Sequence, residues 1–281
     1  IYICFIKNKG GTKEMLKKYN LIFVVLVYGN TNDLVEFIES TKIINGTSKI
    51  VVVNSYLDDA SMKKCNDITK EYDCDFINVE NKGYGAGNNV GIEYAKTNYD
   101  FDFLVVSNPD IIIKKFDFEC LKLYKHNIVG PKIITSTGKN QNPFYTDKKI
   151  FASAEYHFLK TRNKIGYYSI IAMNKCKKML FFTKLKVSKQ CEAPIYAVHG
   201  SCIIFSKYAI DLLNVVFDEN IFLFCEEMVL AEEMKRKGIS AYYTDRIEVY
   251  HKEDGSMKFL SGSMYDEEVK SNGYVLKKYY S

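Results

Sequence analysis

The stretch Leu21-Ile22-Phe23-Val24-Val25-Leu26-Val27-Tyr28 decides the fold class. Every side chain in it is apolar or aromatic, so a strand built from it has no face that suits water. Strands of this kind occur inside parallel sheets that carry helices on both faces. The run is too short to cross a bilayer, because a membrane-spanning helix needs roughly 20 apolar residues. We therefore predict a doubly wound α/β sheet with this strand in its interior.

Strands and helices alternate along the rest of the first half. Further strands are predicted at 49–53, 75–79 and 103–106, and helices from about 32, from about 59 and near 89–96. We expect Asp59 to cap the second of these helices. The alternation predicts parallel strands joined by crossover helices.

Polar loops follow four of these strands, at Gly29-Asn30, Asn54-Ser55, residues 81–89 and residues 108–110. In open α/β sheets, ligands bind beyond the carboxyl ends of the strands, where such loops meet. We therefore expect one ligand site at this edge of the sheet.

The second half is less regular. Residues 135–193 read as a basic, aromatic insert with weak periodicity, followed by a strand at 197–205 and a short helix at 208–213. A charged helix is predicted from Glu226 to Lys237, ended by Gly238, with a last strand ending near His251. We predict a single domain over 15–258, with a first half at about 21–134, the insert, a second half at about 194–258, and a C-terminal extension at 259–281. Residues 1–14 precede a plausible start at Met15 and are given no role.

The insert concentrates the positive charge of the chain. Between Lys139 and Lys189 there are twelve Lys and Arg against Asp147 and Glu155, whereas the whole chain has a net charge of +5. A basic surface with aromatic residues suits contact with an anionic membrane, and Tyr167, Tyr168, Phe181 and Phe182 are candidates for the headgroup level. A lysine-rich face that simply meets water fits the pattern equally well.

The remaining composition narrows the class of protein. The eight cysteines form no C-x-x-C pair, which favours reduced thiols in the cytoplasm over a disulfide framework. The apolar start of the chain lacks the features of a signal peptide. The basic residues match no nucleic-acid-binding module, so we expect no nucleic-acid partner.

Asp110 follows a buried strand in the stretch Ser107-Asn108-Pro109-Asp110. Its carboxylate is placed to enter the crevice at the strand ends, where a hard oxygen ligand suits Mg²⁺ or Mn²⁺. Asn-Pro-Asp is also good turn material, so this residue by itself does not decide the function.

The segment Asn81-Lys82-Gly83-Tyr84-Gly85-Ala86-Gly87-Asn88-Asn89-Val90-Gly91 has glycines that let the backbone approach a ligand and amides that can bind a base or ribose. Its Gly-x-Gly-x-Gly also suggests a dinucleotide-binding fold. That fingerprint belongs after the first strand, however, whereas this segment follows the third.

Two further sites carry titratable groups. Glu226 and Glu227 open a predicted helix, where acidic residues are favourable for the helix alone, but one of them could take a proton from an acceptor hydroxyl. His251, at a strand end, suits either a structural role or a second metal ligand beside Asp110.

The order and spacing of these elements resemble family 2 glycosyltransferases of the GT-A fold, and most of all the rhamnosyltransferase-like branch that builds bacterial cell-surface polysaccharides. The resemblance covers roughly residues 21–258. The matching segments are Asn81–Gly91, Asn108–Asp110, His199-Gly200-Ser201, Phe217–Glu227, and His251 with Gly255-Ser256.

The resemblance implies a mixed, mainly parallel GT-A sheet flanked by helices and an inverting, metal-dependent hexosyltransferase. The donor would be a nucleotide sugar, and the acceptor a glycan or polyprenyl-linked glycan at the inner face of the membrane. Glu227 would be the general base, with Glu226 as its substitute, and Asp110 and His251 would bind Mg²⁺ or Mn²⁺. The nucleotide sugar would lie near Tyr28, Asn54, Asn81, Gly83, Asn88, Asn108 and Gly200.

The chain departs from the family pattern at several positions. Glu227 stands where an Asp is usual, Val229 and Glu233 replace an Asp and an Arg one helical turn apart, and Asn54 replaces an acid. The changes at Val229 and Glu233 leave open a weakly active or non-catalytic sugar-nucleotide-binding relative. A nucleotidyltransferase-like enzyme, which would share the metal aspartate but not the Glu226-Glu227 helix, is a second alternative.

Overall fold

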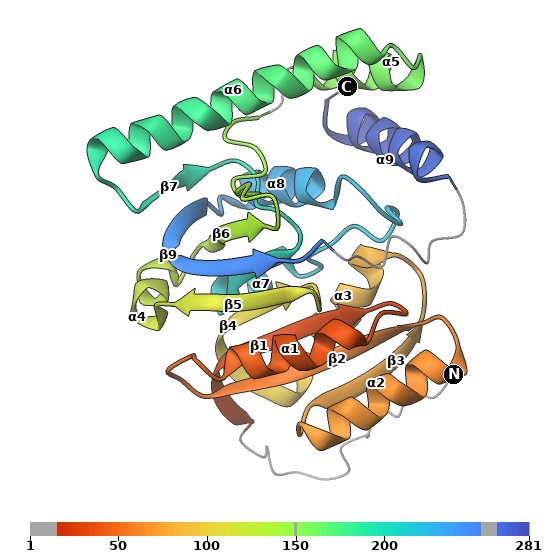
Figure 1. Cartoon of the computed structure of the whole chain (residues 1–281), viewed down its shortest axis with the longest axis vertical. Coiled ribbons are helices and arrows are strands. Elements are labelled where there is room, and N and C mark those ends of the chain that lie inside the picture. Colours follow the sequence, from red (N-terminus) through yellow and green to blue (C-terminus); the bar gives the residue numbers. More distant parts are fainter. Residues whose placement is uncertain (1–15, 149–150, 254–262, 281) are drawn as a thin grey trace.

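A mixed nine-stranded sheet forms the centre of the molecule (Figure 1). The computed structural model describes residues 16–148, 151–253 and 263–280. The strand order is β3-β2-β1-β4-β8-β6-β9-β5, and β7 pairs with β9 beside this path. The strands are β1 (Lys17–Val27), β2 (Ser48–Tyr56), β3 (Asp75–Glu80), β4 (Tyr99–Ser107), β5 (Ile111–Phe116), β6 (Ile128–Thr135), β7 (Glu192–Ile195), β8 (Cys202–Ser206) and β9 (Ala241–His251).

Helices cover both faces of the sheet, as the two-sided apolar strand predicted. They are α1 (Asn32–Thr41), α2 (Asp59–Glu71), α3 (Tyr84–Asn98), α4 (Phe118–Leu121), α5 (Ala152–Lys160), α6 (Lys164–Ser188), α7 (Lys207–Leu213), α8 (Glu226–Lys237) and α9 (Met264–Tyr279). Within the described ranges, no helix combines the length and the apolarity that crossing a bilayer requires.

Alternate side chains of β1 enter opposite cores. Phe23 lies in a cluster with residues of α1 and α2, whereas Val24 lies in a cluster with residues of α3, α7 and α8. Each such buried side chain contributes roughly 1.5–3 kcal/mol relative to an exposed one. A Cβ on Gly91 of α3 would come within 2.4 Å of Val24 Cγ1, so glycine lets this helix lie directly on the sheet.

The parallel half of the sheet brings its strand ends together. Strands β1, β2, β3 and β4 are parallel, and their register sets Val27 beside Asn54 and Val25 beside Ser107. The polar loops that follow β1, β3 and β4 therefore meet at one edge, which confirms the predicted mainly parallel, doubly wound arrangement.

The other half of the sheet, in which parallel and antiparallel pairs are mixed, completes that edge. Strand β5, which the sequence did not predict, starts directly after Asp110 and runs antiparallel to β9, with Ile111 opposite His251. On its other side β9 pairs with β6, where Thr135 lies opposite His251. Because of this pairing, His251 lies next to Asp110, although 140 residues separate the two in the sequence.

A group of three helices lies beyond α8, with α5 and α6 along the top of Figure 1 and α9 below them. Helix α5 packs against α6 and α9, and α9 also packs against α8. The weak periodicity of the insert thus concealed a helix of 25 residues, α6. Apolar residues occur all round α6, so no single amphipathic stripe marks it in the sequence.

Several predicted boundaries differ from the structure. Helix α3 begins at Tyr84 rather than near residue 89, because its glycines are tolerated where the helix touches the sheet. Strand β8 begins at Cys202 rather than at residue 197. The cap of α2 is Asp58, whose side chain accepts a hydrogen bond from the Ser61 amide, and not Asp59.

Candidate active site

Asp110 and His251 form the centre of the site at the strand ends. Both are nearly buried, with exposed fractions of 5% and 7%, and His251 Nε2 lies 3.3 Å from Asp110 Oδ2. Both residues were predicted to be ligands of one metal ion, and the structure brings their side chains together.

Gln141 fixes the orientation of the His251 ring. Its amide nitrogen donates to Glu253 Oε1 at 3.0 Å, so its amide oxygen is the atom that lies 2.7 Å from His251 Nδ1. That oxygen can only accept, so Nδ1 carries the hydrogen. In a neutral imidazole, the lone pair of Nε2 then points at the Asp110 carboxylate. Two lone pairs facing each other at this distance call for a cation between them, a proton or a metal.

The pair fits a divalent cation by its chemistry. A carboxylate oxygen and an imidazole nitrogen whose other nitrogen is hydrogen-bonded are ligands that Mn²⁺ accepts readily. Among the described residues, no cluster of three or more His, Cys, Asp or Glu side chains is suited to a metal ion. The protein would thus supply two ligands here and leave the other positions to substrate oxygens or water.

A cavity of about 470 Å³ adjoins this pair. Its lining includes Tyr28, Asn81, Gly83, Asn108 and Asp110, all predicted as site residues. We call it the donor-side cavity. Its wall requires glycine at position 83, where φ is +103° and a Cβ would lie 2.3 Å from the Phe222 carbonyl oxygen.

Asn54 and Asn88 do not reach this cavity, although the sequence placed both near the nucleotide. Each is fully buried. The Asn54 amide donates to Asn78 Oδ1 on the neighbouring strand, and the Asn88 amide donates to the Tyr84 carbonyl oxygen. Both side chains therefore form hydrogen bonds inside the protein, next to the loops of the site. Ser55, the residue after Asn54 in β2, lines the cavity instead.

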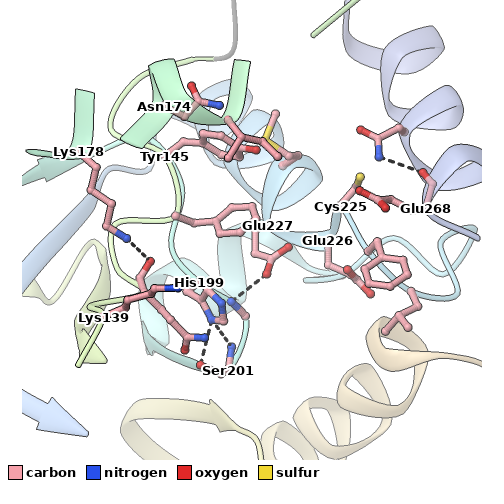
Figure 2. A pocket seen from close by; sticks show the side chains of 18 of the residues that line it. Lys139, Tyr145, Asn174, Lys178, His199, Ser201, Cys225, Glu226, Glu227 and Glu268 are labelled. Atoms are coloured by element: carbon pink, nitrogen blue, oxygen red, sulfur yellow. Dashed lines mark hydrogen bonds between the residues drawn. The ribbon is translucent and has the colours of Figure 1, made fainter. Parts of the chain in front are cut away.

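Glu226 and Glu227 stand at the start of α8, as predicted. Phe224 and Cys225 precede them with φ of +70° and +69°, and this left-handed pair turns the chain sharply into the helix. Glu227 Oε1 accepts a hydrogen bond from the Gly200 amide at 3.1 Å (Figure 2). A Cβ on residue 200 would lie 2.9 Å from that oxygen, so the glycine permits the contact.

The two carboxylates differ in their protonation. Burial, and then the charge of Glu227, raises the pKa of Glu226 to about 8. Glu226 Oε1 has no hydrogen-bond partner among the described residues, which suits a neutral acid better than an anion. At neutral pH the pair therefore retains a proton on Glu226, and Glu227 is the member able to act as a base.

Both glutamates line a second cavity, of about 640 Å³, which we call the acceptor-side cavity. Its wall comes from the segment after β6, from α6 and from α9, and it includes aromatic rings and amides that suit sugars, among them Phe144, Tyr145, Tyr167, Asn174 and Asn272. Figure 2 shows Glu227 and His199 beside this hollow, with Lys178 across from Glu226 and Glu268.

The two cavities share one wall. Residues that line both are Tyr84, Asn108, Gln141, His199, Leu223, Phe224 and Glu253. Tyr84 holds this wall together, because its hydroxyl donates to the Gly200 carbonyl oxygen at 2.7 Å. Burial above all, and then His251 and Lys178, lowers the pKa of His199 to about 3, so this ring is neutral.

The sequence missed several residues of this site. Gln141, Lys178 and Glu268 lie in the insert and the extension, for which no motif was available. The HisGlySer segment was matched, but only Gly200 was selected from it, and His199 was not. The matched residues Gly255 and Ser256 lie outside the described ranges.

Two of the departures from the family pattern, Val229 and Glu233, line neither cavity. Val229 is buried in a small apolar cluster with Val275 of α9, and the Tyr279 hydroxyl donates to Glu233 at 2.7 Å. These substitutions therefore serve the docking of α9 onto α8.

No protein-family model matches the sequence. The chain is 24% identical over 216 residues to the low-salt glycan biosynthesis hexosyltransferase Agl10 of Haloferax volcanii. The match covers 74% of this chain and 60% of the relative, so the chain spans less than two thirds of that protein's length.

Two solved structures share the fold. One is GalNAc-T7 with UDP, GalNAc and Mn²⁺, with a TM-score of 0.59, 11% identity, and coverage of 94% of this chain and 48% of the other. Another is S. aureus TarS, with a TM-score of 0.54, 10% identity, and coverage of 83% and 36%. The chain therefore has the predicted GT-A fold, a mainly parallel mixed sheet flanked by helices.

Proposed function

We propose that this chain is an inverting glycosyltransferase that moves a sugar from a nucleotide-sugar donor to a hydroxyl group of a glycan. One observation carries the proposal: a carboxylate–imidazole pair suited to a metal, and Glu227 at the start of α8, lie in adjoining cavities with a common wall. The hexosyltransferase relative and the GT-A fold support the same class of reaction.

In this reaction each side chain has a separate task. Glu227 removes the proton of the acceptor hydroxyl, whose oxygen bonds to the anomeric carbon while the bond from that carbon to the diphosphate oxygen breaks. Asp110 and His251 would hold Mg²⁺ or Mn²⁺, which neutralises charge on the leaving diphosphate. Neutral Glu226 keeps a second negative charge away from the base, and the Gly200 amide orients the base.

The acceptor and the cellular setting follow from the resemblance. We propose a glycan or polyprenyl-linked glycan acceptor in the synthesis of a bacterial surface polysaccharide, with the basic insert at an anionic membrane surface on the cytoplasmic side. Aromatic, amide and carboxylate groups in the acceptor-side cavity suit sugar hydroxyls and ring faces.

The test is transfer from nucleotide sugars in the presence of Mn²⁺, with released nucleotide diphosphate as the readout. Asp110→Ala should reduce turnover by at least about 100-fold, since it removes one of two protein ligands. Asp211→Ala, a surface aspartate of α7, is the control and should keep full activity. Full transfer by Asp110→Ala would refute the metal role, and consumption of a nucleoside triphosphate instead would indicate a nucleotidyltransferase.

A further inference from the structure

Three lysines gather on one side of the acceptor-side cavity. Lys175 and Lys178 lie one turn apart on α6, and Lys139 lies on the segment after β6. We call them the cavity lysines. None of the three lines the donor-side cavity.

Lys178 is the most enclosed of the three. Its ammonium group donates to the Gln141 carbonyl oxygen at 2.7 Å, and burial lowers its pKa to about 8. An ammonium group has three hydrogens to donate, so this one contact leaves donor capacity toward the cavity.

The cavity lysines have no carboxylate partner within the described part of the chain. Other enclosed or interfacial lysines do: Lys132 pairs with Glu248, Lys148 with Glu232, and Lys252 with Asp33. The same cavity is also lined by Glu155, Glu226, Glu227, Glu253 and Glu268, but among the described residues none of these forms an ion pair with the cavity lysines. Three ammonium groups that face one hollow without a direct ion-pair partner are stabilised when an anion binds between them.

We propose that the cavity lysines form a subsite for a phosphate group carried by the acceptor. This inference rests on the proposed function, because that function makes the cavity the acceptor site. Phosphate fits better than a carboxylate, because it spreads up to two negative charges over several oxygens and can meet three point-like cations. Glu226 and Glu268 lie across the cavity from Lys178, which directs the anion to the lysine side (Figure 2).

The location distinguishes this phosphate from the donor's diphosphate. The diphosphate would lie at Asp110 and His251, and both residues line the donor-side cavity alone. The Gln141 backbone and side chain stand between the two places: its carbonyl oxygen meets Lys178, and its amide oxygen meets His251. The reaction centre at Glu227 would then lie between a donor phosphate and an acceptor phosphate.

The test measures binding of inorganic phosphate to the full chain by titration calorimetry. We expect Lys178→Gln to weaken binding by about tenfold or more, the loss of a charge-assisted contact. Lys178→Arg should retain binding, and Lys139→Gln and Lys175→Gln should each weaken it. The matched control is Lys184→Gln, on the same helix but outside the cavity, and it should change nothing.

A second titration, with UDP and Mn²⁺, separates the subsite from the donor site. Lys178→Gln should bind UDP as the wild type does. Unchanged phosphate affinity in Lys178→Gln, or an equal loss of UDP affinity, would overturn the proposal. If the wild type binds no nucleotide diphosphate, the proposed function fails, while the phosphate titration still decides whether the subsite exists.

The origin of the phosphate is tested with vesicles. Phosphatidylcholine vesicles that contain phosphatidic acid present a lipid-borne phosphate, and binding that Lys178→Gln weakens but Lys184→Gln does not would assign the subsite to a lipid headgroup. Equal vesicle binding by all variants, with phosphate binding still dependent on Lys178, would assign it to a water-soluble phosphorylated acceptor.

Discussion

Gln141, which no motif identified, connects three parts of the site. Its side chain bonds to His251 and Glu253, and its carbonyl oxygen accepts from Lys178. Because the amide is held at both ends, it keeps the His251 ring turned so that Nε2 faces Asp110. Gln141 thus positions the His251 ring, and it would support the proposed metal site without touching the metal.

Replacement of Gln141 by leucine should weaken Mn²⁺ binding about 10–100-fold, the range seen when a partner of a ligating histidine is lost. Electron paramagnetic resonance of free Mn²⁺ measures this without any turnover. Gln190→Leu, at an exposed glutamine after α6, is the control. If Gln141→Leu binds Mn²⁺ with the same affinity as the wild type, Gln141 does not position His251 for metal binding.

At the residue scale, site residues could be predicted from the sequence where they directly follow a strand or begin a helix. Asp110 and Glu227 could be found because the chemistry of a strand end and of a helix start is local. Gln141 could not, since its role depends on the register of β6 with β9. Asn54 and Asn88 were placed at the ligand by motif, but their side chains point into the protein.

Helix α6 is the element that the sequence concealed, and its two faces differ. Toward the protein, Phe181 and Phe182 pack on the Tyr243 ring, and the Tyr167 hydroxyl donates to Glu268. These three aromatic residues therefore do not form the membrane-facing surface that the sequence suggested. Tyr168 is the one of the four predicted residues that is exposed, at 63%.

The outer face of α6 is a better candidate for membrane contact. Its exposed apolar side chains are Ile165, Tyr168, Met179, Leu180 and Val187. The helix contains six lysines and no acidic residue, so pairing with a second copy would set like charges together, whereas an anionic lipid surface would neutralise them.

Leu180→Glu should therefore reduce binding to vesicles that contain phosphatidylglycerol, because it places a carboxylate at the apolar boundary. A several-fold loss is expected in a sedimentation assay. Leu123→Glu changes an equally exposed leucine elsewhere on the surface and should leave binding unchanged. If both variants bind as the wild type does, the outer face of α6 is not the contact.

At the scale of elements, the strands and helices of the first half were predictable because each carries a strong local signal. The apolar runs of β1, β2 and β4 and the capped α2 are of this kind. Strand β5 was not found, because it is short and follows a turn directly. Its pairing with β9 is nevertheless what brings Asp110 and His251 together.

For the molecule as a whole, Glu226 makes stability depend on pH. Its pKa lies near 4.5 in an unfolded chain and at about 8 in the folded one, so the folded state holds the proton more tightly. The contribution of Glu226 to the free energy of unfolding is fully present below pH 4.5 and is lost as the pH rises toward 8. The free energy of unfolding falls by at most about 1.4 kcal/mol per pH unit in this range.

Glu226→Gln, which mimics the neutral acid, should remove this loss. Urea unfolding at about pH 6 and about pH 8 measures the difference, and the free energy of unfolding of the wild type should fall more than that of the variant. Glu71→Gln, at an exposed glutamate of α2, should behave as the wild type. If the free energy of unfolding falls by the same amount in the wild type and in Glu226→Gln, Glu226 is not neutral in the folded protein.

The GT-A class of the whole molecule was predictable from ordered motifs, each of which also admitted a simpler explanation. What could not be predicted is how the insert and the C-terminal extension close over the sheet. Val229 and Glu233 show this best: the sequence indicated a dropped structural pair and left a weakened enzyme open, and in the structure both residues contact α9.

That arrangement has a consequence for redesign of the protein. Helices α5, α6 and α9 pack largely on one another and on α8, and the apolar cluster beneath α9 is small beside the two clusters of the sheet. Substitutions in α5 and α9 should therefore change the acceptor-side wall and leave the packing of the strands intact, whereas Phe181, Phe182 and Leu185 of α6 belong to a cluster of the sheet itself. If the proposed function holds, we expect such substitutions to change which acceptor is used and to leave nucleotide-sugar binding at the strand-end loops unchanged.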